Sequence, residues 1–300
     1  MRRPRRRLLL RAVPLVALLL VGSATTGCSL FGGVDLGVEG VDARYVDVPV
    51  ASGDAREVLV VQSEQLAAAP DPAPVPLVVV LHGYGSDAEI MAKITSLAAE
   101  AGVKNYVGAF GVGQDKSWNA ELCCGASAAG DVDDVDYVRS MILTVESLYP
   151  VDRSRVFLLG YSNGGMMAYR VLCEAPELVS SFVSVAGTNT SGCRASVPRP
   201  LLQLSGDDDP IVPIAGSTVE TAPGVGPVPP VRASVAGVAD DFDCPRSTTQ
   251  VLGPVTEQRW APCRDGVQVV FDVVKGAGHG WPVGEPFSTT QRVLQFWGLV

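Results

Sequence analysis

The chain has 300 residues, of which 47% are hydrophobic and 18% charged, with 32 Gly and 22 Pro. This composition is typical of a folded protein and excludes a disordered chain. The formal net charge is −9 at pH 7, and all 32 acidic residues follow a start of 27 residues that holds six Arg. Such an acidic body offers no basic face to phosphates, which excludes nucleic-acid binding and electrostatic docking on anionic lipid.

The first 27 residues have the layout of an export signal. Five Arg within residues 1–7 precede ten apolar residues at 12–21, and small residues follow up to Gly27. Ten apolar residues are too few to cross a bilayer, which needs about 20. We therefore predict a signal peptide at 1–27, used by either the general secretory or the twin-arginine route, and a secreted, extracytoplasmic protein.

Cys28 directly follows Gly27 and resembles the lipid-modified cysteine of bacterial lipoproteins. The resemblance implies a lipid anchor in the cell membrane at Cys28, although Thr25 stands where that family usually has an aliphatic residue. The alternative is an ordinary signal peptidase site nearby. Residues 28–43 are then the lipidated N-terminus and a Gly-rich tether, and residues 44–300 are the single large domain.

Six further cysteines suit an oxidising compartment, where an even set indicates disulfides. They are Cys123, Cys124, Cys173, Cys193, Cys244 and Cys263. Pairing Cys173 with Cys193 and Cys244 with Cys263 would close loops of about 20 residues and stabilise the fold by roughly 3 kcal/mol each. The adjacent pair could stay reduced and buried. We expect no metal site, because the chain has only two His and neither is near these cysteines.

Short apolar runs alternate with helical patterns along the domain. Leu77–Leu81 lacks any polar alternation, as expected for a strand buried on both faces of a parallel sheet. In Asp131–Tyr149, apolar residues recur at spacings of 3 and 4, which predicts an amphipathic helix. Further strands are expected at 57–61, 155–159, 182–185, 201–204 and 267–274, and further helices at 166–172 and 289–296. This order predicts an α/β fold with a doubly wound, mostly parallel sheet and helices on both faces.

The segment Gly160-Tyr-Ser-Asn-Gly164 lies between a predicted strand and a predicted helix. A Gly-x-Ser-x-Gly motif in this context forces the serine into a tight turn, because a Cβ on either side would clash with neighbouring backbone. The hydroxyl of Ser162 is then presented at the carboxyl edge of the sheet, where a helix N-terminus stabilises negative charge. The motif predicts a nucleophilic serine.

A serine nucleophile needs a base and an acid that orients the base. His279 lies in a Gly-rich loop after strand 267–274 and is the candidate base. The acid should follow strand 201–204, where Asp207, Asp208 and Asp209 are all candidates. The chain order Ser, Asp, His is that of α/β-hydrolases.

The other histidine, His82, follows an early strand in His82-Gly-Tyr-Gly85, a sequence that fits an oxyanion loop. We expect the backbone N–H groups of Tyr84 and Asn163 to stabilise a tetrahedral oxyanion. His82 would shape this loop through hydrogen bonds rather than act as the base.

Eight motifs occur in order along the chain from about Tyr45 to the C-terminus. They are Leu81-His-Gly, Ser117-Trp-Asn119, Cys123-Cys-Gly125, Asp133-Asp-Val135, Val151-Asp-x-x-x-Val156, Gly160-Tyr-Ser-Asn-Gly-Gly-Met166, Asp209-Pro-x-x-Pro213 and Gly278-His-x-Trp-Pro282. In these motifs the chain resembles the polyhydroxybutyrate depolymerase and feruloyl esterase-like family of secreted α/β-hydrolases.

This resemblance implies hydrolysis of carboxylic esters without a cofactor, by a triad of Ser162, Asp209 and His279. Asp209 is the acid because it stands just before a proline, as in the family. Members commonly have Cys where Tyr84 stands, which leaves a bond between Cys123 and Cys124 themselves as an option.

Two tryptophans and one loop are candidates for contact with substrate. Trp118 and Trp281 adjoin the motifs above and could stack on an aromatic acyl group or a sugar, or simply pack in the interior. The Pro- and Gly-rich stretch 221–231 is expected to be an exposed loop. It is either a surface excursion or one wall of a substrate cleft.

The sequence thus predicts an extracytoplasmic serine carboxylesterase that acts on a small-molecule or oligomeric ester. The substrate could be a hydroxyalkanoate oligomer, a feruloyl or acetyl ester of a sugar, or a short acyl ester. The alternatives are a serine peptidase on the same fold and a non-catalytic surface lipoprotein that binds a ligand.

Overall fold

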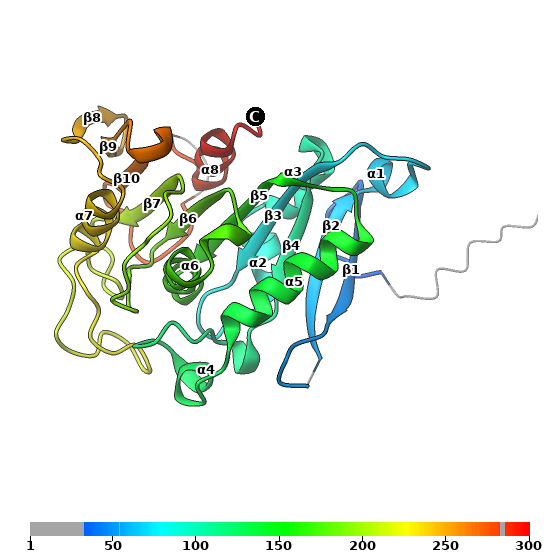
Figure 1. Ribbon diagram of the computed structural model, residues 1–300, viewed down its shortest axis with the longest axis horizontal. Helices are drawn as coiled ribbons and strands as arrows, with labels where there is room; N and C mark the ends of the chain where they lie inside the picture. Colours follow the sequence, from blue (N-terminus) through cyan, green and yellow to red (C-terminus); the bar gives the residue numbers. More distant parts are fainter. Residues whose placement is uncertain (1–32, 54, 283–285) are drawn as a thin grey trace, which may run out of the picture. The chain divides into compact units, whose positions relative to one another are not determined.

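The computed structural model describes residues 33–53, 55–282 and 286–300. In this part of the chain ten strands form one sheet in the order β1-β2-β4-β3-β5-β6-β7-β10-β9-β8 (Figure 1). The strands are β1 (Val41–Val48), β2 (Arg56–Ser63), β3 (Val75–Leu81), β4 (Val107–Gly111), β5 (Val151–Tyr161), β6 (Ser181–Val185), β7 (Leu201–Gly206), β8 (Thr248–Leu252), β9 (Val255–Trp260) and β10 (Val269–Val274). The helices are α1 (Glu64–Ala68), α2 (Ala88–Ile94), α3 (Leu97–Lys104), α4 (Gly125–Ala129), α5 (Asp134–Leu148), α6 (Asn163–Glu174), α7 (Val231–Asp241) and α8 (Thr289–Trp297), with short 3-10 turns at Gln114–Lys116, Pro176–Leu178 and Arg264–Gly266.

The middle of the sheet is parallel and covered on both faces. Strands β4, β3, β5, β6, β7 and β10 run parallel, whereas β1 and β2 at one edge and β9 and β8 at the other are antiparallel. Helices α5, α6 and α7 cover one face, and α2, α3 and α8 cover the other. Every residue of β3 is buried for this reason. The predicted doubly wound, mostly parallel α/β sheet is confirmed.

The strands and helices expected from apolar runs are all present, with small shifts at their ends. The helix expected at 131–149 is α5, which begins where the Asp133 carboxylate accepts the backbone N–H of Asp136 (2.9 Å). The sequence reasoning missed β1, β4, the helices α1, α2, α3, α4 and α7, and the β8–β9 hairpin. All five residues of β8 are exposed, so this strand has no apolar face that a pattern could reveal.

The folded domain starts before residue 44, which is earlier than expected. Strand β1 begins at Val41, Leu36 is buried, and the Val34 N–H donates to the Ala43 carbonyl (2.8 Å). Residues 33–43 therefore pack on the domain, because they carry apolar side chains between their glycines. The predicted signal peptide and Cys28 lie outside the described residues. Within the part described here, no helix combines the length and the apolar character needed to cross a membrane.

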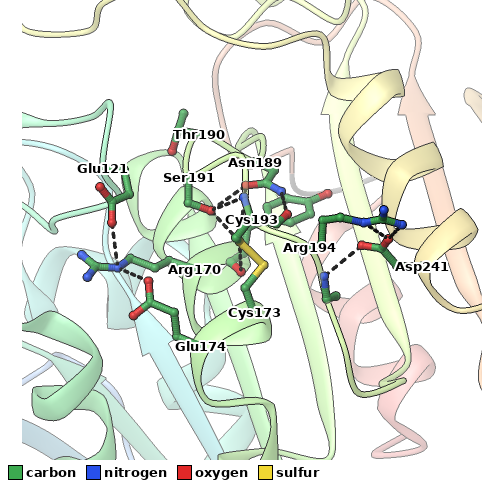
Figure 2. Close-up of a disulfide and its surroundings, with 12 residues drawn as sticks. Glu121, Arg170, Cys173, Glu174, Asn189, Thr190, Ser191, Cys193, Arg194 and Asp241 are labelled. Atoms are coloured by element: carbon green, nitrogen blue, oxygen red, sulfur yellow. Dashed lines mark hydrogen bonds and ion pairs between the residues drawn. A yellow bond between two sulfur atoms is a disulfide. The ribbon is translucent and has the colours of Figure 1, made fainter.

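Three disulfides join the six cysteines of the domain, namely Cys123–Cys124, Cys173–Cys193 and Cys244–Cys263. Figure 2 shows the second of them, which ties the end of α6 to the loop after β6. On one side of it Arg170 pairs with Glu174 (2.8 Å), and on the other Arg194 Nε donates to Asp241 (2.7 Å). The loop after β6 is thus fixed both to α6 and, through Asp241, to α7.

We expect the double variant Cys173→Ala/Cys193→Ala to lose about 3 kcal/mol of unfolding free energy, because opening a 20-residue loop raises the entropy of the unfolded chain. Urea denaturation under non-oxidising conditions measures the loss. The matched control is Cys244→Ala/Cys263→Ala, which opens a loop of 19 residues and should lose a similar amount. Losses that differ by more than about 2 kcal/mol between the two variants would contradict an origin in loop length.

Candidate active site

Ser162 occupies a sharp turn between β5 and α6. Its backbone has φ 54° and ψ −117°, a conformation that a non-glycine residue adopts only where its surroundings enforce it. A Cβ at Gly160 would lie 1.9 Å from the Gly164 carbonyl oxygen, and a Cβ at Gly164 would lie 2.2 Å from the Leu81 carbonyl oxygen. Both glycines are therefore required, as the motif predicted.

His279 and Asp209 meet Ser162 at the carboxyl edge of the sheet. His279 Nε2 lies 2.9 Å from Ser162 Oγ, and His279 Nδ1 lies 2.8 Å from Asp209 Oδ2. Asp209 comes from the loop after β7 and His279 from the loop after β10, and these two strands are neighbours in the sheet. The structure thus brings together the three residues of the predicted triad in hydrogen-bonding order.

The Asp209 side chain is held as an ionised acceptor. Its Oδ1 accepts the backbone N–H groups of Ile211 and Val212, both at 2.8 Å. Burial alone would raise the pKa of Asp209, but the hydrogen bond from His279 and those two amides outweigh it and hold the pKa below its usual value. Asp207 and Asp208 are exposed, and Asp207 accepts the Gly276 N–H instead. Asp209 is accordingly the one member of the acidic run that contacts His279.

Two backbone N–H groups near Ser162 have no hydrogen-bond acceptor among the described residues. Asn163 is the first residue of α6, and the first amides of a helix have no partner within it. Tyr84 lies in the loop after β3, and a Cβ on its neighbour Gly83 would lie 3.3 Å from Ser162 Cβ. Among the described residues neither the Tyr84 nor the Asn163 amide makes a hydrogen bond. Both are free to donate to an atom bound beside Ser162.

His82 shapes this loop, as the sequence reasoning expected. It is buried, its Nε2 accepts the Gly113 N–H (3.0 Å), and its Nδ1 lies 2.8 Å from the Gly83 carbonyl. Because Nε2 must be the acceptor, Nδ1 carries the proton and the ring is neutral. Burial lowers the pKa of His82 to about 4.

Trp118 packs in the interior, which is the second of the two roles considered for the tryptophans. Its side chain is fully buried, its Nε1 donates to the His82 carbonyl (2.8 Å), and its ring stacks on Tyr137. Adjacency to a motif in sequence could not reveal this, because consecutive residues of an irregular segment point in different directions.

Trp281 is half-buried beside the triad. Its Nε1 donates to Thr290 Oγ1 (3.0 Å), and its ring lies edge-on to Tyr161. The Tyr161 ring in turn lies 5.6 Å from the His279 ring, and its hydroxyl donates to the His279 carbonyl (3.3 Å). Trp281 therefore supports the histidine loop through Tyr161, and its contact with substrate stays a prediction.

The Tyr84 side chain is a feature that the sequence reasoning missed. It is 42% exposed, and its ring lies close to two glycines. A Cβ at Gly125 would come within 2.5 Å of the Tyr84 ring, and a Cβ at Gly224 within 3.2 Å. Gly224 belongs to the loop expected at 221–231, which forms a small hairpin with Val225 and Val228 buried beneath it. The loop thus folds back to Tyr84, which lies within the predicted oxyanion loop His82–Gly85.

The described residues contain no group of three or more His, Cys, Asp and Glu side chains that could hold a metal ion. The arrangement at Ser162 is chemically sufficient for acyl transfer: a hydroxyl, a base, an oriented acid and two unpaired amide donors.

The chain is similar in sequence and in fold to known esterases. No family model matches the chain. It is 32% identical over 259 residues to "Putative esterase NocK" of Nocardia uniformis subsp. tsuyamanensis, across 78% of this chain and 75% of that protein. It is 25% identical over 193 residues to feruloyl esterase B of Piromyces equi, across 58% of this chain and 34% of that protein.

Among solved structures, the acetyl xylan esterase from Aspergillus awamori superimposes with a TM-score of 0.61 at 14% identity. The match covers 86% of this chain and 99% of that one. At this identity the likeness establishes the fold alone, which is the α/β-hydrolase fold.

The buried, neutral state of His82 predicts a loss of stability in acid. At pH 5 the unfolded chain protonates this residue and the folded chain, with the pKa at about 4, does not. The free energy of unfolding should therefore fall as the pH drops from about 6.5 towards 4, with His82 contributing up to about 1.4 kcal/mol per pH unit. Urea denaturation between pH 4.5 and 7 should give a shallower slope for His82→Gln than for the wild type. Equal slopes would show that His82 is not buried in the neutral form.

Proposed function

Because the chain belongs to the esterase family of α/β-hydrolases related to feruloyl and acetylxylan esterases, and is a carboxylic ester hydrolase, we propose that it cleaves its ester through an acyl-enzyme on Ser162. The observation that carries the proposal is the unbroken hydrogen-bonded chain from Ser162 Oγ through His279 to Asp209, at 2.9 and 2.8 Å. In this proposal Ser162 is the nucleophile, His279 the general base and acid, and Asp209 the residue that orients His279.

The first half of the reaction transfers the acyl group to the enzyme. Ser162 Oγ attacks the ester carbonyl carbon while its proton passes to His279 Nε2, and the carbonyl oxygen becomes an oxyanion. The tetrahedral species then collapses: the bond to the alkoxy oxygen breaks, and His279 returns the proton to the departing alcohol. In the second half a water molecule attacks the acyl-enzyme by the same sequence, which releases the carboxylic acid and restores Ser162.

The oxyanion would be held by the backbone N–H groups of Tyr84 and Asn163. Both donors are unpaired among the described residues, and the Asn163 amide also lies at the positive end of α6. Removal of one such donor lowers kcat by about 10²- to 10³-fold in comparable enzymes.

We propose that the acyl group is feruloyl or acetyl and that the alcohol is a sugar, with hydroxybutyrate oligomers as the alternative. Support comes from the named activities of the relatives and from the half-exposed ring of Tyr84, which contacts Gly224 and follows Gly83, the residue that approaches Ser162. An aromatic ring at this place can stack on an aromatic acid or on a sugar face.

The site of action is proposed to be outside the cytoplasm. Three disulfides among the described residues favour an oxidising compartment. Export would use residues 1–27. A lipid on Cys28 would then hold the domain on the membrane, that is, residues 44–300 together with the packed residues 33–43.

Replacement of the nucleophile should abolish activity without loss of the fold. We expect Ser162→Ala to lower kcat by about 10⁴-fold or more on methyl ferulate, acetylated xylan, a hydroxybutyrate oligomer and nitrophenyl esters, because the acyl-enzyme cannot form. The control is Ser154→Ala, an exposed serine near the opposite end of the same strand β5. That variant should hydrolyse each ester like the wild type.

The same panel discriminates among the substrates and the alternatives. A preference for methyl ferulate or acetylated xylan supports the sugar-ester proposal, and a preference for the oligomer supports the hydroxyalkanoate alternative. Cleavage of amide but not ester substrates, blocked in Ser162→Ala, would indicate a peptidase. A wild-type protein that neither hydrolyses an ester nor reacts with a fluorophosphonate at Ser162 would overturn the mechanism and favour a binding protein.

Lipid attachment is tested by expressing the full chain in a bacterium with labelled palmitate. We expect the label and the esterase activity in the membrane fraction, and Cys28→Ala should move the activity out of that fraction and lose the label, because the thiol is the acceptor. An unlabelled wild-type protein in the culture medium would contradict the lipid anchor and support cleavage by an ordinary signal peptidase.

A further inference from the structure

The two proposed oxyanion donors come from segments that are far apart in the sequence. Tyr84 follows β3, whereas Asn163 begins α6, and their N–H groups must converge on one oxygen atom. Donors of this kind act only within a narrow range of distance and angle, so something must fix the separation between the two segments.

One residue contacts both segments. The Trp118 backbone N–H donates to Asn163 Oδ1 (2.7 Å), and Asn163 Nδ2 donates to the Trp118 carbonyl (2.9 Å). The indole Nε1 of the same tryptophan donates to the His82 carbonyl (2.8 Å), two residues before Tyr84. Trp118 therefore bridges the residue that carries one donor and the loop that carries the other.

The bridge is buried, and neighbouring side chains fix its position. Trp118 and Asn163 are both fully buried, so water does not compete for these hydrogen bonds. Arg56 lies 5.5 Å above the Trp118 ring and pairs with Asp134 (2.6 Å), which also accepts the Asn119 N–H (2.7 Å). The position of Trp118 is thus fixed along its backbone and against its ring.

We propose that Trp118 is the positioning residue of the oxyanion site: it sets the separation of the Tyr84 and Asn163 N–H groups without contacting the substrate. This inference rests on the proposed function, because it assigns a role in stabilising the tetrahedral intermediate. It also explains why a tryptophan beside the catalytic motifs is entirely buried.

The test is Trp118→Phe, which keeps an aromatic ring but removes the Nε1–H donor to His82. We expect kcat per active site to fall about 10- to 100-fold with KM within about twofold, because a small displacement of the donors weakens the transition state more than the bound ester. Active sites are counted by exhaustive reaction with a fluorophosphonate, so that unfolded protein does not lower the measured kcat. The Ki of phenylboronic acid, whose tetrahedral adduct carries an oxygen in the oxyanion site, should rise by a similar factor.

The matched control is Trp297→Phe on α8. Trp297 is also buried and stacked on an aromatic ring, and its Nε1 has no hydrogen-bond partner among the described residues. It should show wild-type kcat, KM and Ki. If Trp118→Phe does not fold, incorporation of 3-benzothienylalanine at 118 replaces the N–H by sulfur with little change in shape, and the same fall in kcat is expected.

Two outcomes overturn the inference. One is a kcat per active site equal to that of the wild type, and the other is a higher KM with unchanged kcat, which would assign Trp118 to substrate binding. Failure of the proposed function gives a different result, because the wild-type protein would then show neither ester hydrolysis nor labelling at Ser162.

Discussion

The close approach of three backbone segments at Ser162 is the constraint on which the site depends. Gly160 at the end of β5, Gly164 in the first turn of α6 and the carbonyl of Leu81 at the end of β3 lie so close that no side chain fits between them. Ser162 lies in this turn with a positive φ, and its hydroxyl is 2.9 Å from His279 Nε2. It also sets the N-terminus of α6 beside the loop that follows β3. One close contact between backbone segments therefore fixes the positions of Ser162 and of both proposed oxyanion donors.

The two histidines differ in burial and in hydrogen-bond partners, and these differences suit them to different roles. His82 is buried and its ring nitrogens contact Gly113 and Gly83, so it is held neutral with both nitrogens engaged in hydrogen bonds to backbone. His279 lies in a half-buried loop with one nitrogen on a carboxylate and the other on a hydroxyl. Only the second arrangement can accept a proton and return it. We therefore expect the same residue type to serve as a structural element in one loop and as the proposed proton carrier in the other.

The fold and the core of the site could be predicted because their signals are local. Uninterrupted apolar runs predict buried strands such as β3, and the Gly-x-Ser-x-Gly segment by itself predicts a tight turn. The choice of Asp209 within an acidic run needed a family resemblance, since what distinguishes it is its hydrogen bonds to His279, Ile211 and Val212, which the sequence does not show. The burial of Trp118 and the exposure of Tyr84 could not be predicted. Both depend on which way a loop side chain points, and that is set by residues far away in the chain.

The proposed bridge at Trp118 and the contact between Tyr84 and Gly224 differ in burial, and this difference separates chemistry from specificity. In the bridge, Trp118 and Asn163 are fully buried and joined by hydrogen bonds, so we expect a change there to displace the proposed donors, which would act on every ester alike. By contrast, the half-exposed ring of Tyr84 meets Gly224, an exposed residue of a surface hairpin. The exposed positions of this hairpin can change side chain without leaving a buried polar group unpaired. Substitutions in the hairpin should therefore alter which ester binds, whereas substitutions at the buried bridge alter how fast any bound ester reacts.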